Sequence, residues 1–344
     1  MQRRTGVRLR KGGISIMENL KLGVKIGDLH LKNPVMPASG AFGFEMESLF
    51  DFNDLGAIVP KSITKYPRGG NDTPRVCEVT GGMLNSIGIQ SKGLLYYIEH
   101  ILPQYEQYDT PLIASISADS VEEFVEMSEI IGKEKNVAGI ELNISCPNLE
   151  GDGKAFGMDA ELSYQLIKKV KEATDQPIIA KLTPNVTSIQ EIALACERGG
   201  ADGLNVANTM LAMAIDIHTR KPKIGNVLGG ISGPATKPII VRLIHQVRKV
   251  TALPIIGCGG VSNWEDAIEM ILAGANAIQV GTASFINPMS MMEILEGIKE
   301  YMIAYQIEDI NDLVGKVELP MQQVESFNEY VSEGEIHHAM GSCN

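Results

Sequence analysis

Short apolar runs and longer amphipathic stretches alternate along most of this 344-residue chain. From residue 33 onward each run is mostly apolar, as in a strand buried on both faces of a parallel sheet, and the stretches between runs have apolar residues at helical spacing. This alternation predicts repeated β-α units. The eight runs that we expect to form strands are residues 34–38, 57–61, 112–116, 139–143, 178–181, 203–206, 255–257 and 277–280.

The helices expected between these strands are clearest in six segments, several of which start near Ser or Asn, as helices with a capped N-terminus do. They are residues 120–133, 159–174, 188–198, 238–250, 263–273 and 288–301. Eight β-α units in succession predict an α/β fold of the (β/α)8 TIM-barrel type, which chains of this length form as a single domain. We expect the barrel at residues 17–317, an N-terminal extension at 1–16 and a C-terminal tail at 318–344.

Two connections are too long to be simple turns, namely residues 62–111 and 208–237. They follow the second and the sixth expected strand. We therefore expect long loops at the C-terminal face of the barrel, which is the face where barrel enzymes bind their substrates.

Composition and charge narrow the function classes. Hydrophobic residues make up 44% of the chain and charged residues 21%, as in ordinary folded proteins. The net charge of −12 argues against a nucleic-acid partner, because phosphate binding depends on clustered cations. No apolar run is long enough to span a bilayer, and the five cysteines lack the spacing of a metal site or a disulfide framework. We expect a cytoplasmic protein without metal and without a membrane partner.

Polar residues and glycines follow all eight expected strands. Any one of them could be an ordinary loop or capping residue, but in a barrel all eight positions meet at one mouth. They are Ser39, Lys61, Ser115, Asn143, Lys181, Asn208, Gly259 and Gly281.

The last two units contain the segments IIGCGGV (255–261) and IQVGTA (278–283), in which small residues separate a strand from a helix. Glycine lets backbone N–H groups approach an anion, and these loops are the usual phosphate site of such barrels. We expect Gly259, Gly260, Gly281 and Thr282 to hold a phosphate. The alternative is that the glycines are only turn residues.

Two lysines, Lys61 and Lys181, end the second and the fifth strand, where burial of an ammonium is costly unless an anion compensates it. They indicate an anionic ligand. The alternatives are a Schiff-base lysine, as in barrel aldolases, or an ion pair with a nearby carboxylate.

The segment ELNISCPN (141–148) follows the fourth strand and presents one thiol between asparagines. Amides with a single thiol suit a small, planar, polar ligand. We expect Cys146 to act as a proton acceptor, whereas Cys77, Cys196 and Cys258 are expected to be packing residues.

With these motifs the chain resembles the class 1 dihydroorotate dehydrogenases over about residues 18–317. The motifs are PASGAFGF (37–44), PKSIT (60–64), NSIGIQ (85–90), NISCPN (143–148), AKLTPN (180–185), VANT (206–209), GGISGPA (229–235), GCGGV (257–261) and QVGTASF (279–285). KAFGMD (154–159) and the sequence around Gly229 are most similar to the NAD-linked subclass 1B, whose FMN-containing catalytic subunit pairs with a subunit that holds FAD and a 2Fe-2S cluster.

The resemblance implies oxidation of (S)-dihydroorotate to orotate in pyrimidine biosynthesis. A hydride would pass from the ring to N5 of FMN, and the thiolate of Cys146 would take the C5 proton. The electrons would then reach NAD⁺ through the FAD and 2Fe-2S subunit, in a heterotetramer of two catalytic and two electron-transfer subunits.

The matching motifs also imply roles for individual residues, with Lys61 in contact with both flavin and orotate. The other implied substrate contacts are Asn85, Ser86, Ile87, Gly88, Ile89, Asn143, Asn148, Asn208 and Thr209. The other implied FMN contacts are Ser39, Ser62, Ser115, Asn143, Lys181, Ala207, Ser232, Gly233, Gly259, Gly260, Gly281 and Thr282. The sequence departs from the family at Ser115, where an asparagine is usual, and at Ala207, where a larger aliphatic residue is common.

Three other functions are compatible with the same motifs. A dihydropyrimidine dehydrogenase acting on uracil or thymine shares the Asn/Cys loop but needs no contact to a carboxylate. A phosphate-binding lyase or aldolase would use Lys181 as a Schiff base. A catalytically silent subunit would bind FMN alone.

Overall fold

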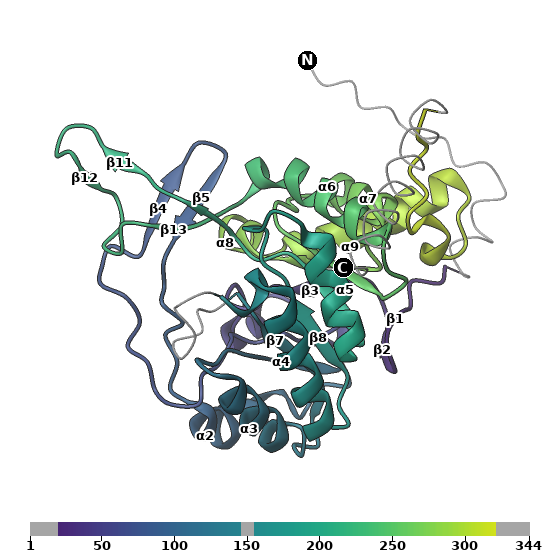
Figure 1. Cartoon of the computed structure of the whole chain (residues 1–344). Coiled ribbons are helices and arrows are strands. Elements are labelled where there is room, and N and C mark those ends of the chain that lie inside the picture. Colours follow the sequence, from purple (N-terminus) through teal and green to yellow (C-terminus); the bar gives the residue numbers. More distant parts are fainter. Residues whose placement is uncertain (1–19, 146–154, 321–344) are drawn as a thin grey trace, which may run out of the picture.

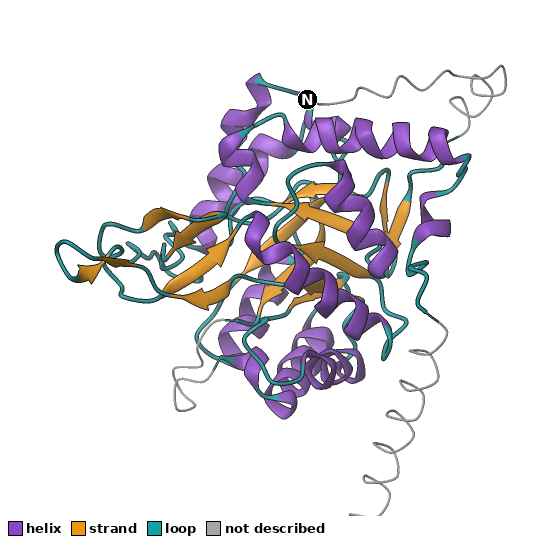
Figure 2. Ribbon diagram, turned by 90° about the horizontal axis from the view of Figure 1, so that it is seen from above, coloured by secondary structure: helices purple, strands orange, loops and turns teal. Residues whose placement is uncertain are grey.

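The fold, seen in a computed structural model that describes residues 20–145 and 155–320, is a (β/α)8 barrel (Figures 1 and 2). Seven parallel strands form one sheet in the order β3-β15-β14-β9-β8-β7-β6, so neighbours in the sheet follow the chain around the barrel. Figure 2 shows this sheet surrounded by helices. The strands are β3 (Val35–Pro37), β6 (Leu112–Ile116), β7 (Val137–Asn143), β8 (Ile178–Lys181), β9 (Gly203–Val206), β14 (Ile255–Cys258) and β15 (Ala277–Val280).

The expected strand at 57–61 is not a regular strand, and this prediction was wrong in detail. The segment closes the barrel between β3 and β6 through isolated parallel bridges from Ile58 to Leu112 and from Ile63 to Ile116. On its other side the N–H of Gly56 donates to the carbonyl of Val35 at 2.8 Å. Pro60 lies between the two bridges, and because proline has no N–H the ladder is interrupted there.

The six expected helices all form around the sheet, with ends shifted by a few residues. Four of them begin at a Ser, Asp or Asn whose side chain accepts a hydrogen bond from the backbone three residues further on, as N-caps do. They are α3 (Val121–Ile131), α4 (Ala160–Ala173), α5 (Ile189–Gly199), α6 (Lys237–Arg248), α7 (Trp264–Ala273) and α9 (Ser290–Tyr305). None of the helices in the described ranges is long and apolar enough to cross a membrane.

Shorter helical segments lie in the connections between these elements. The two short α-helices are α2 (Leu94–Tyr96) and α8 (Thr282–Ile286). The 3-10 and π segments are η1 (Phe44–Ser48), η2 (Phe52–Asp54), η3 (Tyr97–Ile101), η4 (Leu102–Tyr105), η5 (Phe156–Met158), η6 (Pro234–Thr236) and η7 (Ile310–Leu313).

A hairpin of β1 (Val24–Ile26) and β2 (Leu29–Leu31) closes the end of the barrel at which the strands begin. A Cβ added to Gly203, the first residue of β9, would lie 2.5 Å from the side chain of Ile26. A Cβ on Gly139, early in β7, would lie 3.5 Å from Leu29. Small residues at the strand starts therefore let apolar hairpin side chains enter the barrel.

The two long connections, for which the sequence predicts only loops, meet in an antiparallel sheet over the barrel mouth. Its order is β10-β13-β5-β4, so strands from the first connection pair with strands from the second. A separate two-stranded hairpin projects beyond it (Figure 1). The strands are β4 (Val76–Val79), β5 (Gly82–Asn85), β10 (Met210–Ala212), β11 (Ile215–Asp216), β12 (Lys221–Pro222) and β13 (Gly229–Ser232).

Gly56 lies where the barrel closes next to β3, and we predict that a larger residue there would destabilise the fold. A Cβ there would lie 2.1 Å from the carbonyl oxygen of Asn33, and because that atom is backbone it cannot move aside cheaply. We expect Gly56→Ala to destabilise the fold by about 1–3 kcal/mol, the usual cost of overpacking, and to lower the melting temperature by several degrees. Gly69→Ala is the control, since nothing lies within 4 Å of its Cβ position. Equal melting temperatures for the two variants would contradict this account of the closure.

Candidate functional site

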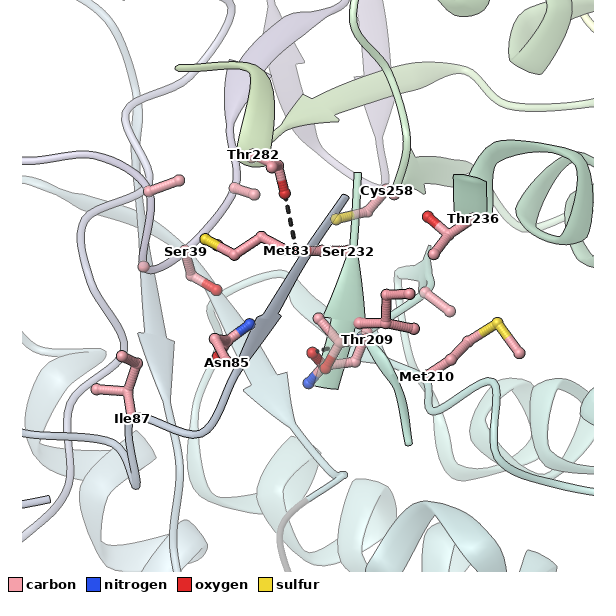
Figure 3. A pocket seen from close by; sticks show the side chains of 18 of the residues that line it. Ser39, Met83, Asn85, Ile87, Thr209, Met210, Ser232, Thr236, Cys258 and Thr282 are labelled. Atoms are coloured by element: carbon pink, nitrogen blue, oxygen red, sulfur yellow. Dashed lines mark hydrogen bonds between the residues drawn. The ribbon is translucent and has the colours of Figure 1, made fainter. Parts of the chain in front are cut away.

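A cavity of about 560 Å³ lies between the C-terminal ends of the barrel strands and the sheet above them. Figure 3 shows Met83 and Asn85 on β5 and Thr209 and Met210 near β10, facing the same space as Ser39 and Cys258. Most residues expected to bind ligand from sequence line it. They are Ser39, Lys61, Ser62, Asn85, Ile87, Gly88, Ile89, Asn143, Lys181, Ala207, Asn208, Thr209, Ser232, Gly259, Gly260, Gly281 and Thr282.

Three expected contacts do not line the cavity. Ser115 is buried, and its hydroxyl lies 2.8 Å from that of Ser62 and donates to Glu141. The Ser86 hydroxyl accepts a hydrogen bond from Asn71, and Gly233 precedes η6. Two further expected residues, Cys146 and Asn148, lie outside the described residues.

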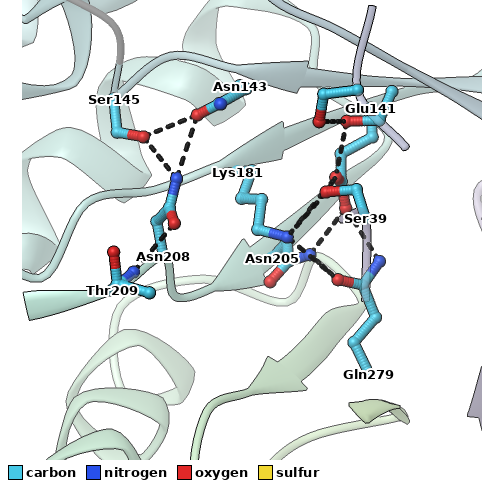
Figure 4. Close-up of polar contacts among 11 residues, drawn as sticks. Ser39, Glu141, Asn143, Ser145, Lys181, Asn205, Asn208, Thr209 and Gln279 are labelled. Carbon is cyan, nitrogen blue, oxygen red and sulfur yellow. Dashed lines mark hydrogen bonds and ion pairs between the residues drawn. The ribbon is translucent and has the colours of Figure 1, made fainter. Parts of the chain in front are cut away.

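The floor of the site is a buried polar network around Glu141 of β7 (Figure 4). Glu141 is 0% exposed, and one of its oxygens accepts hydrogen bonds from Ser39 and Ser115, each at 3.0 Å. The same oxygen lies 3.5 Å from Nζ of Lys181 on β8.

Asn205 on β9 and Gln279 on β15 complete the network. Their amide nitrogens donate to the second oxygen of Glu141 at 2.7 and 2.8 Å. Lys181 also donates to the Gln279 carbonyl oxygen at 3.1 Å and to Ser39 at 3.3 Å. Side chains from four different strands thus meet around one carboxylate.

The network keeps Glu141 and Lys181 ionised. Burial is the largest single influence on each group and disfavours both charges, but the attraction between the two charges opposes it. Hydrogen bonds from Gln279, Asn205 and Ser39 add to this attraction for Glu141, and the hydrogen bond to Glu141 adds to it for Lys181. The pKa of Glu141 therefore lies below its ordinary value and the pKa of Lys181 above its own. The ion pair, one of the alternatives for Lys181, is present.

Glu141, Asn205 and Gln279 were missed as site residues by sequence reasoning. Each lies inside a strand, one or two residues before the strand end, and not in a loop where polar residues are expected to act. The available signal was a charged or amide residue in an otherwise apolar, fully buried strand, because such a residue needs a partner.

Lys61 differs from Lys181 in its electrostatic surroundings. It lines the cavity and is partly buried, and burial lowers its pKa. No carboxylate lies within 4.0 Å of its ammonium in the part of the chain that the structure describes. A cation in this position attracts an anionic ligand.

An amide cluster lies on another wall of the cavity (Figure 4). The side-chain nitrogen of Asn208 donates to the Asn143 carbonyl oxygen at 3.0 Å, and Ser145 donates to the same oxygen at 2.5 Å. The Asn208 carbonyl oxygen accepts from the backbone of Thr209. These bonds fix the orientation of the two asparagines at the cavity wall, and Asn143 and Ser145 lie within three residues before position 146 in the chain.

The backbone of the expected phosphate cradle requires glycine at two positions. Gly259 and Gly260 have φ of +122° and +84°, a region that favours glycine. A Cβ on Gly260 would lie 2.6 Å from the backbone nitrogen of Lys237. Among the described residues, no acceptor is hydrogen-bonded to the backbone N–H groups of Gly260, Gly281 or Thr282. Donors that face a cavity without partners suit a phosphate group.

The fold and the site together define a barrel with a cavity at the C-terminal ends of its strands, lined by a glycine cradle, an amide cluster and two lysines. The family model of dihydroorotate dehydrogenase matches residues 21–302. This chain belongs to the dihydroorotate dehydrogenase family, and the resemblance found from its motifs is confirmed.

Curated relatives agree with the family match over nearly their whole length. The protein of Desulforamulus reducens is 49% identical over 302 residues, which are 87% of this chain and 99% of the relative. That of Bacillus pumilus is 48% identical over 297 residues (86% and 96%), and that of Listeria monocytogenes is 48% identical over 295 residues (85% and 97%). All three are named dihydroorotate dehydrogenase B (NAD(+)), catalytic subunit.

The buried ion pair predicts a pH-dependent stability effect. Glu141→Gln leaves the Lys181 ammonium buried without its counter-ion, and we expect a loss of about 3–5 kcal/mol of unfolding free energy near neutral pH. Because the pKa of Glu141 is lowered in the folded state, its contribution is present above its ordinary pKa of 4.5 and is lost as the pH falls through its lower folded pKa. The wild type should therefore lose more stability on acidification than the variant.

Denaturant unfolding at several pH values checks this prediction. Glu122→Gln is the matched control, because Glu122 pairs with Lys169 at 3.1 Å on the exposed surface, where ion pairs contribute little. Similar losses in the two variants would show that Glu141 contributes no more than a surface carboxylate.

Proposed function

We propose that this chain oxidises (S)-dihydroorotate to orotate in de novo pyrimidine biosynthesis, as the FMN-containing catalytic subunit of an NAD⁺-linked, cytoplasmic dihydroorotate dehydrogenase. Its family membership and the names of its relatives support the reaction. The observation that carries the proposal is the meeting of an unpaired lysine, an amide cluster and a glycine cradle in one cavity.

The residues present fit FMN. The free N–H groups of Gly260, Gly281 and Thr282 suit its phosphate, and Ser39, Ser62, Ala207 and Ser232 line the space between this cradle and the two lysines. FMN, when bound, supplies the acceptor for the substrate hydride. Lys181, whose pKa is raised by its pairing with Glu141, would supply a positive charge to the isoalloxazine ring as that ring gains negative charge.

The substrate contacts follow from charge and hydrogen-bonding capacity. Dihydroorotate has one carboxylate and a ring with amide donors and carbonyl acceptors. Lys61 is the cation available to the carboxylate, and Asn85, Asn143 and Asn208 present both donors and acceptors to the ring. Ile87, Gly88, Ile89 and Thr209 would complete the substrate pocket.

Cys146 is the proposed base. Its thiolate would take the C5 proton of the substrate, and the thiol would return this proton to solvent after product release. Asn143, three residues earlier, is held by Ser145 and Asn208, so the amides next to the base are already oriented.

The charge of Lys61 and the raised pKa of Lys181 also distinguish this function from two of its alternatives. Uracil and thymine have no carboxylate, so a dihydropyrimidine dehydrogenase would leave Lys61 uncompensated. A Schiff-base lysine needs a lowered pKa, whereas the pKa of Lys181 is raised.

The electrons would leave through a separate subunit. The relatives are named as catalytic subunits, which supports a second, electron-transfer subunit. We propose that this partner contains FAD and a 2Fe-2S cluster, that it passes electrons to NAD⁺, and that two copies of each subunit assemble.

Anaerobic titration of the purified protein with dihydroorotate tests the activity directly. The flavin band should bleach, and NAD⁺ should restore it only when the electron-transfer subunit is present. A yellow protein that responds to dihydrouracil but not to dihydroorotate would favour a dihydropyrimidine dehydrogenase, and a colourless protein would favour the lyase.

Removal of the base should slow chemistry without loss of cofactor. We expect Cys146→Ala to stay yellow but to reduce its flavin with dihydroorotate about two to four orders of magnitude more slowly, the usual contribution of a general base. Stopped-flow absorbance measures this rate. Cys77→Ala is the control, and an unchanged rate in Cys146→Ala would exclude the thiolate role.

Removal of the unpaired cation should weaken substrate binding. We expect Lys61→Met to raise the dissociation constant of orotate by about tenfold or more, because a charge-assisted hydrogen bond contributes about 1.5–3 kcal/mol. The shift of the flavin spectrum on titration with orotate measures it. The control is Lys65→Met, since Lys65 pairs with Glu126 at 2.6 Å outside the cavity. Equal affinities would contradict the assignment of Lys61 to the carboxylate.

A further inference from the structure

The ammonium of Lys181 is held by three acceptors, and the nearest of them is not the carboxylate. Its Nζ lies 3.1 Å from the Gln279 carbonyl oxygen, 3.3 Å from the Ser39 hydroxyl and 3.5 Å from Glu141 (Figure 4). An ammonium has three N–H donors, so these acceptors account for all of them. Glu141 balances the charge of Lys181, whereas Gln279 makes the closest polar contact with it.

The amide of Gln279 is fixed in one orientation. Gln279 is 1% exposed on β15, and its side-chain nitrogen donates to Glu141 at 2.8 Å. A carboxylate only accepts hydrogen bonds and an ammonium only donates them, so the nitrogen must face Glu141 and the oxygen must face Lys181. Turning the amide over would place a donor against the ammonium. The position of the lysine charge is therefore tied to β15 by a side chain with a single favourable orientation.

Asn205 on β9 supports this orientation. Its side-chain nitrogen donates to the Gln279 oxygen and to Glu141, each at 2.7 Å. Its own carbonyl oxygen is buried and has no hydrogen-bond partner within the described residues. Because a buried acceptor without a partner is destabilising, the favourable contribution of Asn205 comes from its nitrogen. That nitrogen bridges the two groups that hold Lys181.

Lys181 lies between this network and the cavity. It lines the cavity, although the residue is only 4% exposed. Gln279 and Asn205 are not among the described residues that line the cavity, so they act on a ligand there only through Lys181. In a site with little water, a small displacement of a charge changes its interaction with a ligand strongly.

We propose that Gln279, supported by Asn205, is a positioning residue that fixes the Lys181 ammonium at the cavity, so that its charge acts on the flavin ring as the ring gains negative charge. This inference rests on the proposed binding of FMN. Both amides are neutral and hold the lysine without cancelling its charge, which a second carboxylate in their place would do. The network thereby stabilises a negatively charged ring more than a neutral one.

Sulfite binding to the FMN-loaded protein tests the charge at the ring without turnover. The sulfur forms a bond to N5 of the oxidised flavin with its own electron pair, and the ring takes up negative charge, so a well-placed cation tightens the binding. We expect Gln279→Met to raise the dissociation constant of sulfite about threefold to tenfold, equivalent to the loss of one hydrogen bond. Bleaching of the flavin band measures it.

The affinity for FMN itself distinguishes positioning from a merely structural role. The oxidised ring is neutral, so the dissociation constant of FMN for the apoprotein should change less than about twofold in Gln279→Met. Quenching of flavin fluorescence measures this constant. A variant whose cavity is simply distorted would lose affinity for FMN and for sulfite alike.

Two further variants complete the comparison. Gln165→Met is the matched control, because Gln165 donates to Glu161 at 2.7 Å on the exposed surface of α4, and it should equal the wild type in both affinities. Asn205→Ala removes the support of Gln279 but leaves every direct contact of Lys181 in place. It should weaken sulfite binding by a smaller factor, and it tests the inference even if Gln279→Met does not fold.

The effect of Gln279 should pass through Lys181. We expect Lys181→Met to weaken sulfite binding more than Gln279→Met does, and the double variant to bind sulfite no more weakly than Lys181→Met alone. Such non-additivity is the signature of two residues that act as one unit.

Three outcomes would overturn the inference while leaving the proposed function intact. One is an unchanged sulfite affinity in a folded, yellow Gln279→Met, and another is an equal loss of affinity for sulfite and for FMN. The third is a further loss of sulfite affinity when Gln279→Met is added to Lys181→Met, since Gln279 would then act independently of the lysine. A wild type that does not bind FMN would contradict the proposed function and this inference with it.

Discussion

The buried ion pair between Glu141 and Lys181 is the interaction on which the site depends. Both charges are removed from water at the centre of the barrel, where neither would persist alone. Hydrogen bonds from amides on β9 and β15 and from a hydroxyl after β3 offset part of the free energy that burial of the pair costs. Because these groups come from strands that are far apart in the sequence, the pair holds its geometry only when the whole barrel is closed. The fixed positive charge that it maintains lies at the floor of the cavity.

The two strand-end lysines show how the same residue type serves different roles. Lys181 has a carboxylate partner and a raised pKa, so it stays protonated and its charge is balanced within the protein. Lys61 has no such partner in the described ranges and has a lowered pKa, so its charge is satisfied only by a ligand. In the proposed function, Lys181 supplies a fixed positive charge to the cavity and Lys61 binds the carboxylate of the substrate.

The cavity needs two structural layers. The barrel supplies the lysines, the glycine cradle and the amides of Asn143 and Asn208, whereas the sheet above it supplies Asn85, Met83 and Ser232. That sheet forms only because the two long connections pair through β5 and β13, in which the partners Asn85 and Gly230 lie 145 residues apart in the sequence.

The sequence by itself determined the barrel, because apolar runs and amphipathic stretches are local patterns with distinct periods. It also determined the glycine cradle and most of the cavity lining, because strand ends of a barrel converge wherever they lie in the chain. It did not determine that 57–61 lacks a regular ladder, that Ser115 hydrogen-bonds to Glu141 and does not line the cavity, or that Asn205 and Gln279 belong to the site. Only the tertiary structure decided these points, because the partners of a buried polar group are residues distant in sequence, and strand periodicity does not identify them.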